Sequence, residues 1–303
     1  MIADLLTFSV STNLTQFRAD VRLVRERTRW YDRRMTTVVF DMDGVLYRGK
    51  EALPHASEVV GILRRRKVRL GFLTNNSVRT RLEYADILAG HGIEIRLNEV
   101  MTSGEATARH LIAGGQRDKR VYAIGGKGLV ETLDYYGFAV ETDGGEEPCD
   151  FVIIGWDREF TFHKIVRAQS EILYNGAKLI ATNTDAMFPS KDDRFLPGAG
   201  AMVAAVERAS GVKAEVIGKP ETISLRYLLD ELGASPDTQA ADVWMVGDRL
   251  DTDIACGNAY GARTVCVTTG IATREQAENA ESPLRPEFII DSLDELPGLI
   301  DDG

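Results

Sequence analysis

Four clusters of acidic, hydroxyl, amide and lysine side chains each follow an apolar run of the chain. They are Asp41 and Asp43, then Thr74, Asn75 and Asn76, then Lys219, and finally Asp248 and Asp253. Each cluster alone is typical of a polar turn after a strand. Their joint order, however, is the one that a magnesium-assisted phosphoryl-transfer site requires.

Each side-chain type in these clusters has its own use in phosphoryl transfer. A carboxylate such as Asp41 can act as nucleophile and form an aspartyl-phosphate. Mg²⁺ held by oxygen ligands offsets the repulsion between that carboxylate and a phosphate dianion. A lysine and polar donors stabilise the equatorial oxygens of the transferred group. The pattern therefore predicts a small phosphorylated metabolite as substrate and Mg²⁺ as cofactor.

The sequence D-x-D-G also occurs in calcium-binding loops, so that alternative is tested by position. With Asp41 as the first residue, an EF-hand loop needs Gly at the sixth position and Glu at the twelfth. Leu46 and Ala52 stand there instead. The calcium-loop interpretation is therefore excluded.

The elements that must position these clusters alternate between strand-like and helix-like patterns. The runs at 68–73, 243–247 and 263–267 are continuously apolar, as strands buried on both faces are. Amphipathic segments at 54–66 and 78–92 predict helices between them. The alternation predicts a Rossmann-like, doubly wound parallel sheet, in which ligands bind at the carboxyl ends of the strands.

The middle of the chain repeats this alternation as a second, smaller α/β domain. Strands are predicted in "RVYAIGG", "DFVIIGW" and "KLIATN", with helices near 127–136, 161–175 and 200–209. We place this inserted cap domain at 118–210. The core domain is then assembled from 36–117 and 211–303.

Composition limits the location and partners of the chain. A net charge of -10 over 303 residues argues against a nucleic-acid or anionic-membrane binder. The three cysteines are widely spaced and no signal peptide precedes the first strand, so the cytoplasm is the expected compartment. A homo-oligomer is compatible with the sequence. Residues 1–34 are interpreted as an arm, disordered or docked, or as the product of a mis-chosen start upstream of Met35.

The motifs resemble the haloacid dehalogenase (HAD) superfamily, and specifically its NagD-like subfamily of p-nitrophenyl phosphatases. Six segments stand in the family's order: "DMDGVLYRG", "TNN", "ATNTDAMFP", "PGAGAMVAA", "IGKP" and "GDRLDTDI". The resemblance extends over nearly all of 36–303. It implies a HAD core with an α/β cap of the C2 type inserted between the second and third motifs, and a phosphatase activity.

The resemblance also implies catalytic and metal-binding roles. Asp41 is expected to be the nucleophile and a Mg²⁺ ligand. Asp43 is expected to bind the metal through its carbonyl and to act as general acid, then as base. Lys219 matches the lysine of the third motif. Asp248 matches the direct metal ligand of the fourth motif, and Asp253 its supporting acid.

Substrate-binding residues are expected in both domains. Thr74 matches the phosphate-binding residue of the second motif, with Asn75 and Asn76 beside it. In the cap, Asn183 and Asp185 follow the run "KLI" at the carboxyl end of a predicted strand and are candidates for reading the leaving group. The alternative is a turn in which their side chains only satisfy backbone amides.

The sequence leaves two alternatives to a hydrolase open. A phosphotransferase or phosphomutase would use the same core and pass the phosphoryl group to a hydroxyl acceptor instead of water. A non-catalytic phospho-ligand binding module could keep the fold, but it would have little reason to keep Asp41, Asp43, Lys219 and Asp248 together.

Overall fold

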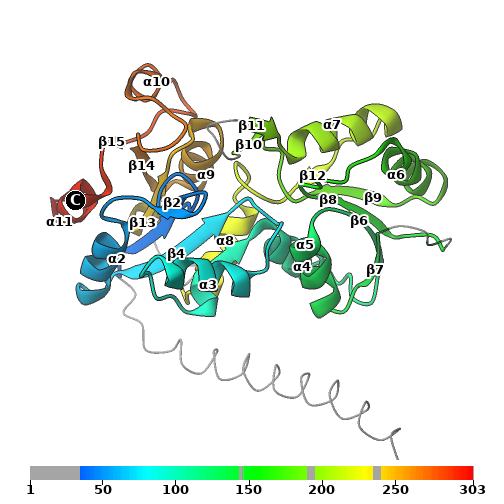
Figure 1. The fold of residues 1–303 in the computed structure, drawn as a ribbon, viewed down its shortest axis with the longest axis horizontal. Helices are drawn as coiled ribbons and strands as arrows, with labels where there is room; N and C mark the ends of the chain where they lie inside the picture. Colours follow the sequence, from blue (N-terminus) through cyan, green and yellow to red (C-terminus); the bar gives the residue numbers. More distant parts are fainter. Residues whose placement is uncertain (1–34, 143–144, 146, 190–194, 235–239, 303) are drawn as a thin grey trace, which may run out of the picture.

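Two parallel β-sheets with flanking helices form the molecule (Figure 1). The computed structural model describes residues 35–142, 145, 147–189, 195–234 and 240–302. The predicted arm at 1–34 lies outside these residues. No helix in the described ranges is both long and apolar enough to cross a membrane.

The larger sheet, which we call the core sheet, has six strands in the order β15-β14-β13-β1-β4-β5. Every neighbouring pair in it is parallel. Its strands are β1 (Thr37–Phe40), β4 (Arg69–Thr74), β5 (Val100–Thr102), β13 (Val243–Gly247), β14 (Arg263–Val267) and β15 (Phe288–Ile290). The predicted doubly wound parallel sheet is thus confirmed.

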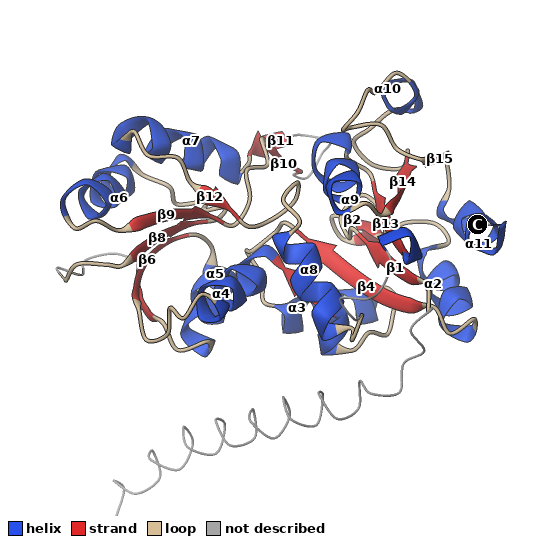
Figure 2. Cartoon of the chain, turned by 180° about the vertical axis from the view of Figure 1, so that it is seen from behind, coloured by secondary structure: helices blue, strands red, loops and turns tan. Residues whose placement is uncertain are grey.

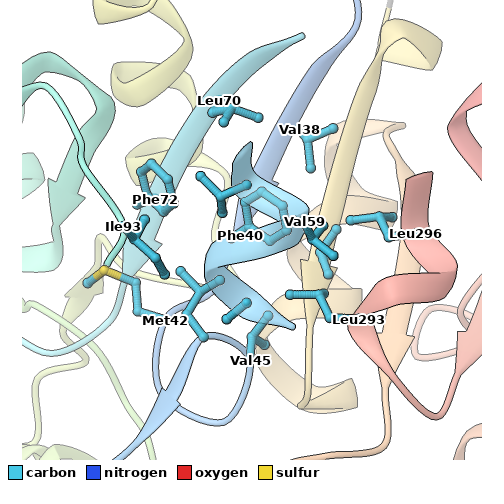
Figure 3. Packing of buried hydrophobic residues seen from close by; sticks show 14 of the residues in the cluster. Val38, Phe40, Met42, Val45, Val59, Leu70, Phe72, Ile93, Leu293 and Leu296 are labelled. Atoms are coloured by element: carbon cyan, nitrogen blue, oxygen red, sulfur yellow. The ribbon is translucent and has the colours of Figure 1, made fainter. Parts of the chain in front are cut away.

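Helices cover both faces of the core sheet because successive strand residues point to opposite faces and are buried on both. Val38 and Phe40 of β1 pack in one cluster with Val59 of α2 (Figure 3). Val39 points to the other face and packs in a cluster with Leu228 of α8. The helices beside this sheet are α2 (Ala56–Arg65), α3 (Arg81–Gly90), α8 (Ile223–Glu231), α9 (Ala255–Tyr260), α10 (Arg274–Glu278) and α11 (Leu296–Asp302).

The second sheet, with the helices that cover it, is the cap. It has five parallel strands in the order β12-β9-β8-β6-β7. They are β6 (Arg120–Ile124), β7 (Ala139–Glu141), β8 (Phe151–Ile154), β9 (Lys178–Ala181) and β12 (Glu215–Val216). β12 pairs with β9, so the cap sheet reaches past the limit of 210 that the sequence predicts. A two-residue strand is too short to carry a periodic signal.

Helices lie on both sides of the cap sheet (Figures 1 and 2). They are α4 (Ser103–Ala113), α5 (Lys127–Tyr135), α6 (Phe162–Tyr174) and α7 (Ala199–Ser210). Ile153 of β8 packs in the same cluster as Leu111 of α4, whereas Ile154 packs in the cluster of Ile172 of α6. Period-2 alternation therefore organises this layer as well.

Two short antiparallel hairpins complete the fold. β2 (Tyr47–Arg48) pairs with β3 (Glu51–Ala52), and β10 (Met187–Pro189) pairs with β11 (Phe195–Pro197). The first follows the turn that holds Asp43, and the second follows Asp185. Both hairpins thus lie next to predicted site residues.

Threonine side chains cap the starts of four helices in the described ranges, α3, α4, α6 and α10. The hydroxyl of Thr80 accepts the N–H of Glu83 at 3.3 Å, and that of Thr102 accepts the N–H of Glu105 at 3.0 Å. Thr161 caps α6 in the same way. Each cap satisfies an N–H group that the first turn leaves without a partner. The caps at Thr80 and Thr102 set the starts of α3 and α4, which follow the strand ends β4 and β5.

Candidate active site

The carboxyl ends of adjacent core strands bring the predicted clusters together. β1 lies between β13 and β4 in the sheet. Asp41 directly follows β1, Thr74 ends β4, and Asp248 directly follows β13. The N–H of Asp41 donates to the carbonyl of Val246 at 2.8 Å, so the ladder between β1 and β13 continues to the acid itself.

Lys219 is the cation at the centre of the site. Its Nζ lies 2.5 Å from Oδ1 of Asp41 and 2.6 Å from Oδ1 of Asp253. It also donates to the carbonyl of Leu73 at 3.2 Å. Lys219 is only 1% exposed, so water does not screen these contacts.

Three carboxylates surround a position that suits a cation. One oxygen from each of Asp41, Asp248 and Asp253 lies within 4.8 Å of the others. Oδ2 of Asp248 accepts the N–H of Ile271 at 2.8 Å. Within the described part of the chain, its buried Oδ1 has no hydrogen-bond partner. An unpaired buried carboxylate oxygen in an all-oxygen cluster fits Mg²⁺, which prefers such ligands.

Glycines leave room for the Asp248 carboxylate. A Cβ atom at Gly44 or at Gly270 would overlap it. Gly44 also has φ +92, a conformation that L side chains rarely adopt. Two features therefore require glycine at position 44: the backbone conformation of the turn and the close approach of Asp248.

Charge balance in the cluster shifts the pKa values of its members. Burial raises the pKa of Asp41 well above its ordinary value, and Lys219 only partly opposes this. Burial and the neighbouring Asp253 raise the pKa of Asp248 to about 7. Burial acts to lower the pKa of Lys219, but Asp253 and Asp41 outweigh it and raise that pKa. The ammonium thus stays charged, and a further cation beside the acids would favour their charged forms.

Asp43 lies in the tight turn between β1 and β2, apart from the three clustered carboxylates. Its half-buried side chain has a raised pKa because of burial, which the Arg48 charge and a backbone hydrogen bond from Gly49 only partly oppose. A raised carboxyl pKa favours the protonated form that a general acid needs. Burial raises the pKa of Asp41 as well, so what distinguishes the two acids is that Asp41 contacts the Lys219 ammonium at 2.5 Å, whereas Arg48 is the main positive charge beside Asp43.

Thr74 and Asn76 form a turn at the end of β4. The Thr74 hydroxyl accepts the N–H of Asn76 at 3.1 Å, and Oδ1 of Asn76 accepts the N–H of Val78 at 2.9 Å. Thr74 is buried, and its hydroxyl hydrogen can still be donated to a ligand. Phosphate binding by these two residues stays a prediction.

The structure brings the cap residues Asn183 and Asp185 to Asn75 of the core. Asn75 Nδ2 donates to Oδ1 of Asp185 at 2.9 Å, and Asn183 Nδ2 donates to the carbonyl of Asn75 at 2.7 Å. Oδ1 of Asn183 accepts the N–H of Asp185 at 3.2 Å. Both ends of the buried Asn183 amide are thus engaged within the protein. This geometry favours the turn interpretation for Asn183, and its predicted substrate contact stays untested.

Arg249, within the motif "GDRLDTDI", adds a positive charge beside these acids. Its N–H donates to Oδ2 of Asp253 at 3.1 Å, and its guanidinium binds Asp251. Arg249 is also the charge that most lowers the pKa of Asp185, which burial raises overall. In the sequence, the one indication that Arg249 belongs to the site is its position between Asp248 and Asp251.

Comparison with known proteins decides the family. A model described as haloacid dehalogenase-like hydrolase matches residues 38–139, and a HAD-hydrolase-like model matches 216–296. Human (Homo sapiens) glycerol-3-phosphate phosphatase is 35% identical over 314 residues, covering 92% of this chain and 95% of that protein. The chain belongs to the haloacid dehalogenase-like hydrolases. These matches confirm the resemblance to the HAD superfamily that the motifs indicate.

Other HAD relatives carry phosphatase names as well. Acid sugar phosphatase of Staphylococcus epidermidis is 37% identical over 245 residues, covering 81% of this chain and 91% of that protein. The structure of p-nitrophenyl phosphatase from Archaeoglobus fulgidus aligns with a TM-score of 0.78 at 31% identity, covering 88% of this chain and 99% of that one. The NagD-like assignment and the capped HAD fold are confirmed. The chain is a phosphoric monoester hydrolase.

Proposed function

We propose that this HAD enzyme hydrolyses a small phosphomonoester with Mg²⁺ through an aspartyl-phosphate on Asp41. The observation that supports this most is the buried cluster at the end of β1. There the Asp41 carboxylate contacts the Lys219 ammonium at 2.5 Å and has an oxygen within 4.8 Å of oxygens of Asp248 and Asp253. A nucleophilic carboxylate, its cation and metal-binding acids are thus in one place.

The residues of the cluster fit a divalent metal. Asp41 and Asp248 would ligate it directly, Asp253 would support them, and Asp43 would contribute its backbone carbonyl, as the family resemblance implies. Mg²⁺ bound there supplies positive charge that offsets repulsion between the phosphate dianion and the carboxylates. Among the described residues, Asp41, Asp248 and Asp253 are the one group of three potential ligands that lies close enough to hold a metal.

In the first half of the reaction, an oxygen of Asp41 attacks phosphorus and the bond from phosphorus to the leaving-group oxygen breaks. Asp43 donates its proton to that oxygen, which leaves as an alcohol. Lys219 and the Thr74 hydroxyl hold the equatorial oxygens of the transferred group. The products of this half are the free alcohol, the aspartyl-phosphate and the Asp43 carboxylate.

In the second half, water attacks the phosphorus of the aspartyl-phosphate. Asp43 now accepts a proton from that water, and the bond from phosphorus to the Asp41 oxygen breaks. Inorganic phosphate leaves, and both aspartates return to their starting states. One carboxyl group thus acts as acid and then as base.

We propose a small metabolite phosphate as the substrate, with no role for nucleic acid or membrane. The relatives are named glycerol-3-phosphate phosphatase, acid sugar phosphatase and phosphoglycolate phosphatase. Phosphates of small polyols, sugars and hydroxy acids are therefore the first compounds to assay. The excess of negative charge on the protein does not oppose them, because the metal and Lys219 provide local positive charge.

Phosphate release from a panel of such esters, with Mg²⁺ and with excess chelator, tests the proposal. We expect turnover of p-nitrophenyl phosphate and of at least one metabolite, lost on chelation. Undiminished turnover in chelator would exclude the metal-dependent mechanism. A sugar hydroxyl acceptor that takes the phosphoryl group in place of water would instead indicate a phosphotransferase.

A further inference from the structure

The amide of Asn75 is fully occupied by protein groups. Its Oδ1 accepts the N–H of Lys219 at 2.8 Å, and its Nδ2 donates to the carbonyl of Lys219 at 2.8 Å. The second Nδ2 hydrogen goes to Oδ1 of Asp185 at 2.9 Å. An amide NH₂ has two hydrogens, so Asn75 has none left for a phosphate oxygen. Asn75 is only 6% exposed, and its side chain binds protein groups in place of the predicted substrate.

Residues at the end of β4 bind both the backbone and the ammonium group of Lys219. The Asn75 side chain pairs with both main-chain polar groups of the lysine, as a neighbouring strand would. At the far end, the carbonyl of Leu73 accepts from Nζ at 3.2 Å. Since Asn75, directly after β4, binds the backbone of Lys219 and Leu73 of β4 binds its ammonium, the lysine side chain has little freedom between them.

The cap holds Asn75 in turn. Asp185 accepts from its side chain, and Asn183 donates to its main-chain carbonyl at 2.7 Å. Asn183 also fixes Asp185 by accepting the N–H of that residue at 3.2 Å. The turn from 183 to 185 therefore contacts both the side chain and the backbone of one core residue.

Gly218 independently indicates that the sequence accommodates the close contact between Asn75 and the segment before Lys219. A Cβ atom at Gly218 would lie 2.6 Å from Oδ1 of Asn75, closer than real side chains come. The Gly218 N–H donates to the carbonyl of Thr182 at 2.9 Å, next to Asn183. A residue without a side chain thus stands where Asn75, the cap and the lysine segment meet.

We propose that Asn75 is a positioning residue that holds the Lys219 ammonium against Asp41 and links that position to the cap through Asp185 and Asn183. This rests on the proposed function, because Lys219 acts there on the transferred phosphoryl group. If the cap moves away, the Asn75 side chain loses its hydrogen bond to Asp185 and holds Lys219 less firmly. The cap thereby influences the chemical step as well as the leaving group.

The kinetic test uses p-nitrophenyl phosphate and orthovanadate, a mimic of the transition state. Asn75→Ala should lower kcat by roughly 100-fold and leave KM within about threefold, because Lys219 acts mainly in the transition state. The inhibition constant of orthovanadate should rise along with the loss in kcat/KM. A rise in KM with unchanged kcat would overturn the proposal and restore a substrate-binding role.

The link to the cap is tested by a double-mutant cycle. Asp185→Ala alone should lower kcat by about tenfold, and the double variant should be no slower than Asn75→Ala, since Asp185 acts through Asn75. Losses that multiply in the double variant would show that Asp185 acts independently, and would overturn the link.

Asn258→Ala is the matched control for lost stability. Asn258 also binds main-chain carbonyls, those of Pro283 at 2.6 Å and Arg285 at 2.9 Å, away from the site. This variant should lower the melting temperature comparably to Asn75→Ala and leave kcat within about twofold. An equal loss of kcat in both variants would mean that Asn75 acts only through stability.

Amide hydrogen exchange separates this inference from the proposed function. In Asn75→Ala the N–H of Lys219 loses its acceptor, so exchange of the 217–221 peptide should be roughly tenfold faster, with no change in the Asn258→Ala control. This readout needs no turnover. If the wild type fails to hydrolyse any ester, the proposed function fails, and exchange still decides the role of Asn75. Unchanged exchange would overturn it.

Discussion

Asp41, Asp248 and Asp253 are buried together with a single ammonium, that of Lys219. Three carboxylates and one cation leave an excess of negative charge in a space with little water. Such an arrangement costs folding free energy, because buried charges lose hydration and like charges repel. Natural proteins tolerate this cost at functional sites. The excess charge is the physical reason for expecting a divalent metal here.

Asp43→Asn tests the acid and base role at the residue scale. The substitution keeps the volume and removes the proton that the leaving group needs, so kcat for p-nitrophenyl phosphate should fall about 10²–10⁴-fold. Substrate binding should change little. Asp86→Asn, on the exposed face of α3, is the control and should keep wild-type rates. An effect of Asp43→Asn confined to KM would contradict the role.

Asp248→Asn should separate stability from activity. Burial and Asp253 raise the pKa of Asp248 to about 7, so its charge penalises folding above that pH, and the penalty is lost as pH falls toward the ordinary carboxyl range. In chelator near pH 8, Asp248→Asn should therefore melt higher, by roughly 2–4 °C for each kcal/mol relieved. Its activity with Mg²⁺ should fall sharply.

The comparison variant is Asp251→Asn, whose carboxylate is 64% exposed and pairs with Arg249. It should leave the melting temperature in chelator nearly unchanged, because exposed pairs contribute little. If Asp248→Asn melted lower than the wild type in chelator, the buried acids would not be the source of strain that their geometry indicates.

The core site residues were predictable from the sequence because their signal is local. Asp41, Thr74 and Asp248 each follow a recognisable apolar strand, and parallel strands place their carboxyl ends at one edge. The role of Asn75 was not predictable. It depends on which groups the chain brings to within hydrogen-bond distance from positions 185 and 219, and neither sequence spacing nor residue type specifies that.

At the scale of elements, long apolar or amphipathic runs were predicted well and short strands were not. The predicted helix at 161–175 matches α6 (Phe162–Tyr174), because a long amphipathic face gives a strong periodic signal. β12 and the hairpin β2–β3 have only two residues per strand. Their existence follows from pairing with β9 or with each other, which is a tertiary effect.

Glu171 anchors α6 to the loop before β8, and its environment gives a pH-dependent prediction. Its side chain, 3% exposed, accepts from Cys149 N–H at 2.8 Å and from Arg167 Nε at 2.7 Å. Burial acts to raise the pKa of Glu171, but these hydrogen bonds and one from Asn175 lower it overall. The carboxylate therefore contributes stability above the ordinary glutamate pKa, and this is lost as pH falls through the lowered value.

Glu171→Gln should accordingly lose about 1–3 kcal/mol of unfolding free energy near neutral pH, because buried donors are left with a poorer acceptor. The loss should shrink below about pH 4. Urea unfolding at both pH values measures it. Glu278→Gln, which alters an exposed i,i+4 pair on α10, should cost under about 0.5 kcal/mol at either pH. A pH-independent loss would contradict the linkage.

At the scale of the molecule, one partly buried ionic cluster joins the core to the cap. Glu105 of α4 lies 3.3 Å from Arg81 at the start of α3 and 3.1 Å from Arg109. Arg109 also pairs with Glu231 of α8. Tyr136, at the end of α5 in the cap, donates to Glu105 at 2.5 Å. Four helices from both layers thus depend on the same charges.

Glu231→Gln should destabilise the whole molecule. It leaves Arg81 and Arg109 sharing the single carboxylate of Glu105. Removing one partner of a fully buried pair typically costs about 3–5 kcal/mol, and we expect the lower end, about 3 kcal/mol, for these partly buried side chains. For a chain of this size that corresponds to a fall in melting temperature of roughly 6–12 °C. Activity of the folded protein at low temperature should stay near the wild-type value, since Glu231 contacts none of the site residues in the described structure.

The control for this variant is Glu131→Gln, which breaks an exposed pair with Lys127 on α5 and should shift the melting temperature little. The shape of the transition is equally informative. One apolar cluster runs from Val39 of the core through Leu228 of α8 and Leu111 of α4 to Ile153 of the cap. Because core and cap share it, Glu231→Gln should lower one common transition. Two separate transitions, with only one of them shifted, would mean that the layers unfold independently and that the cluster stabilises one layer alone.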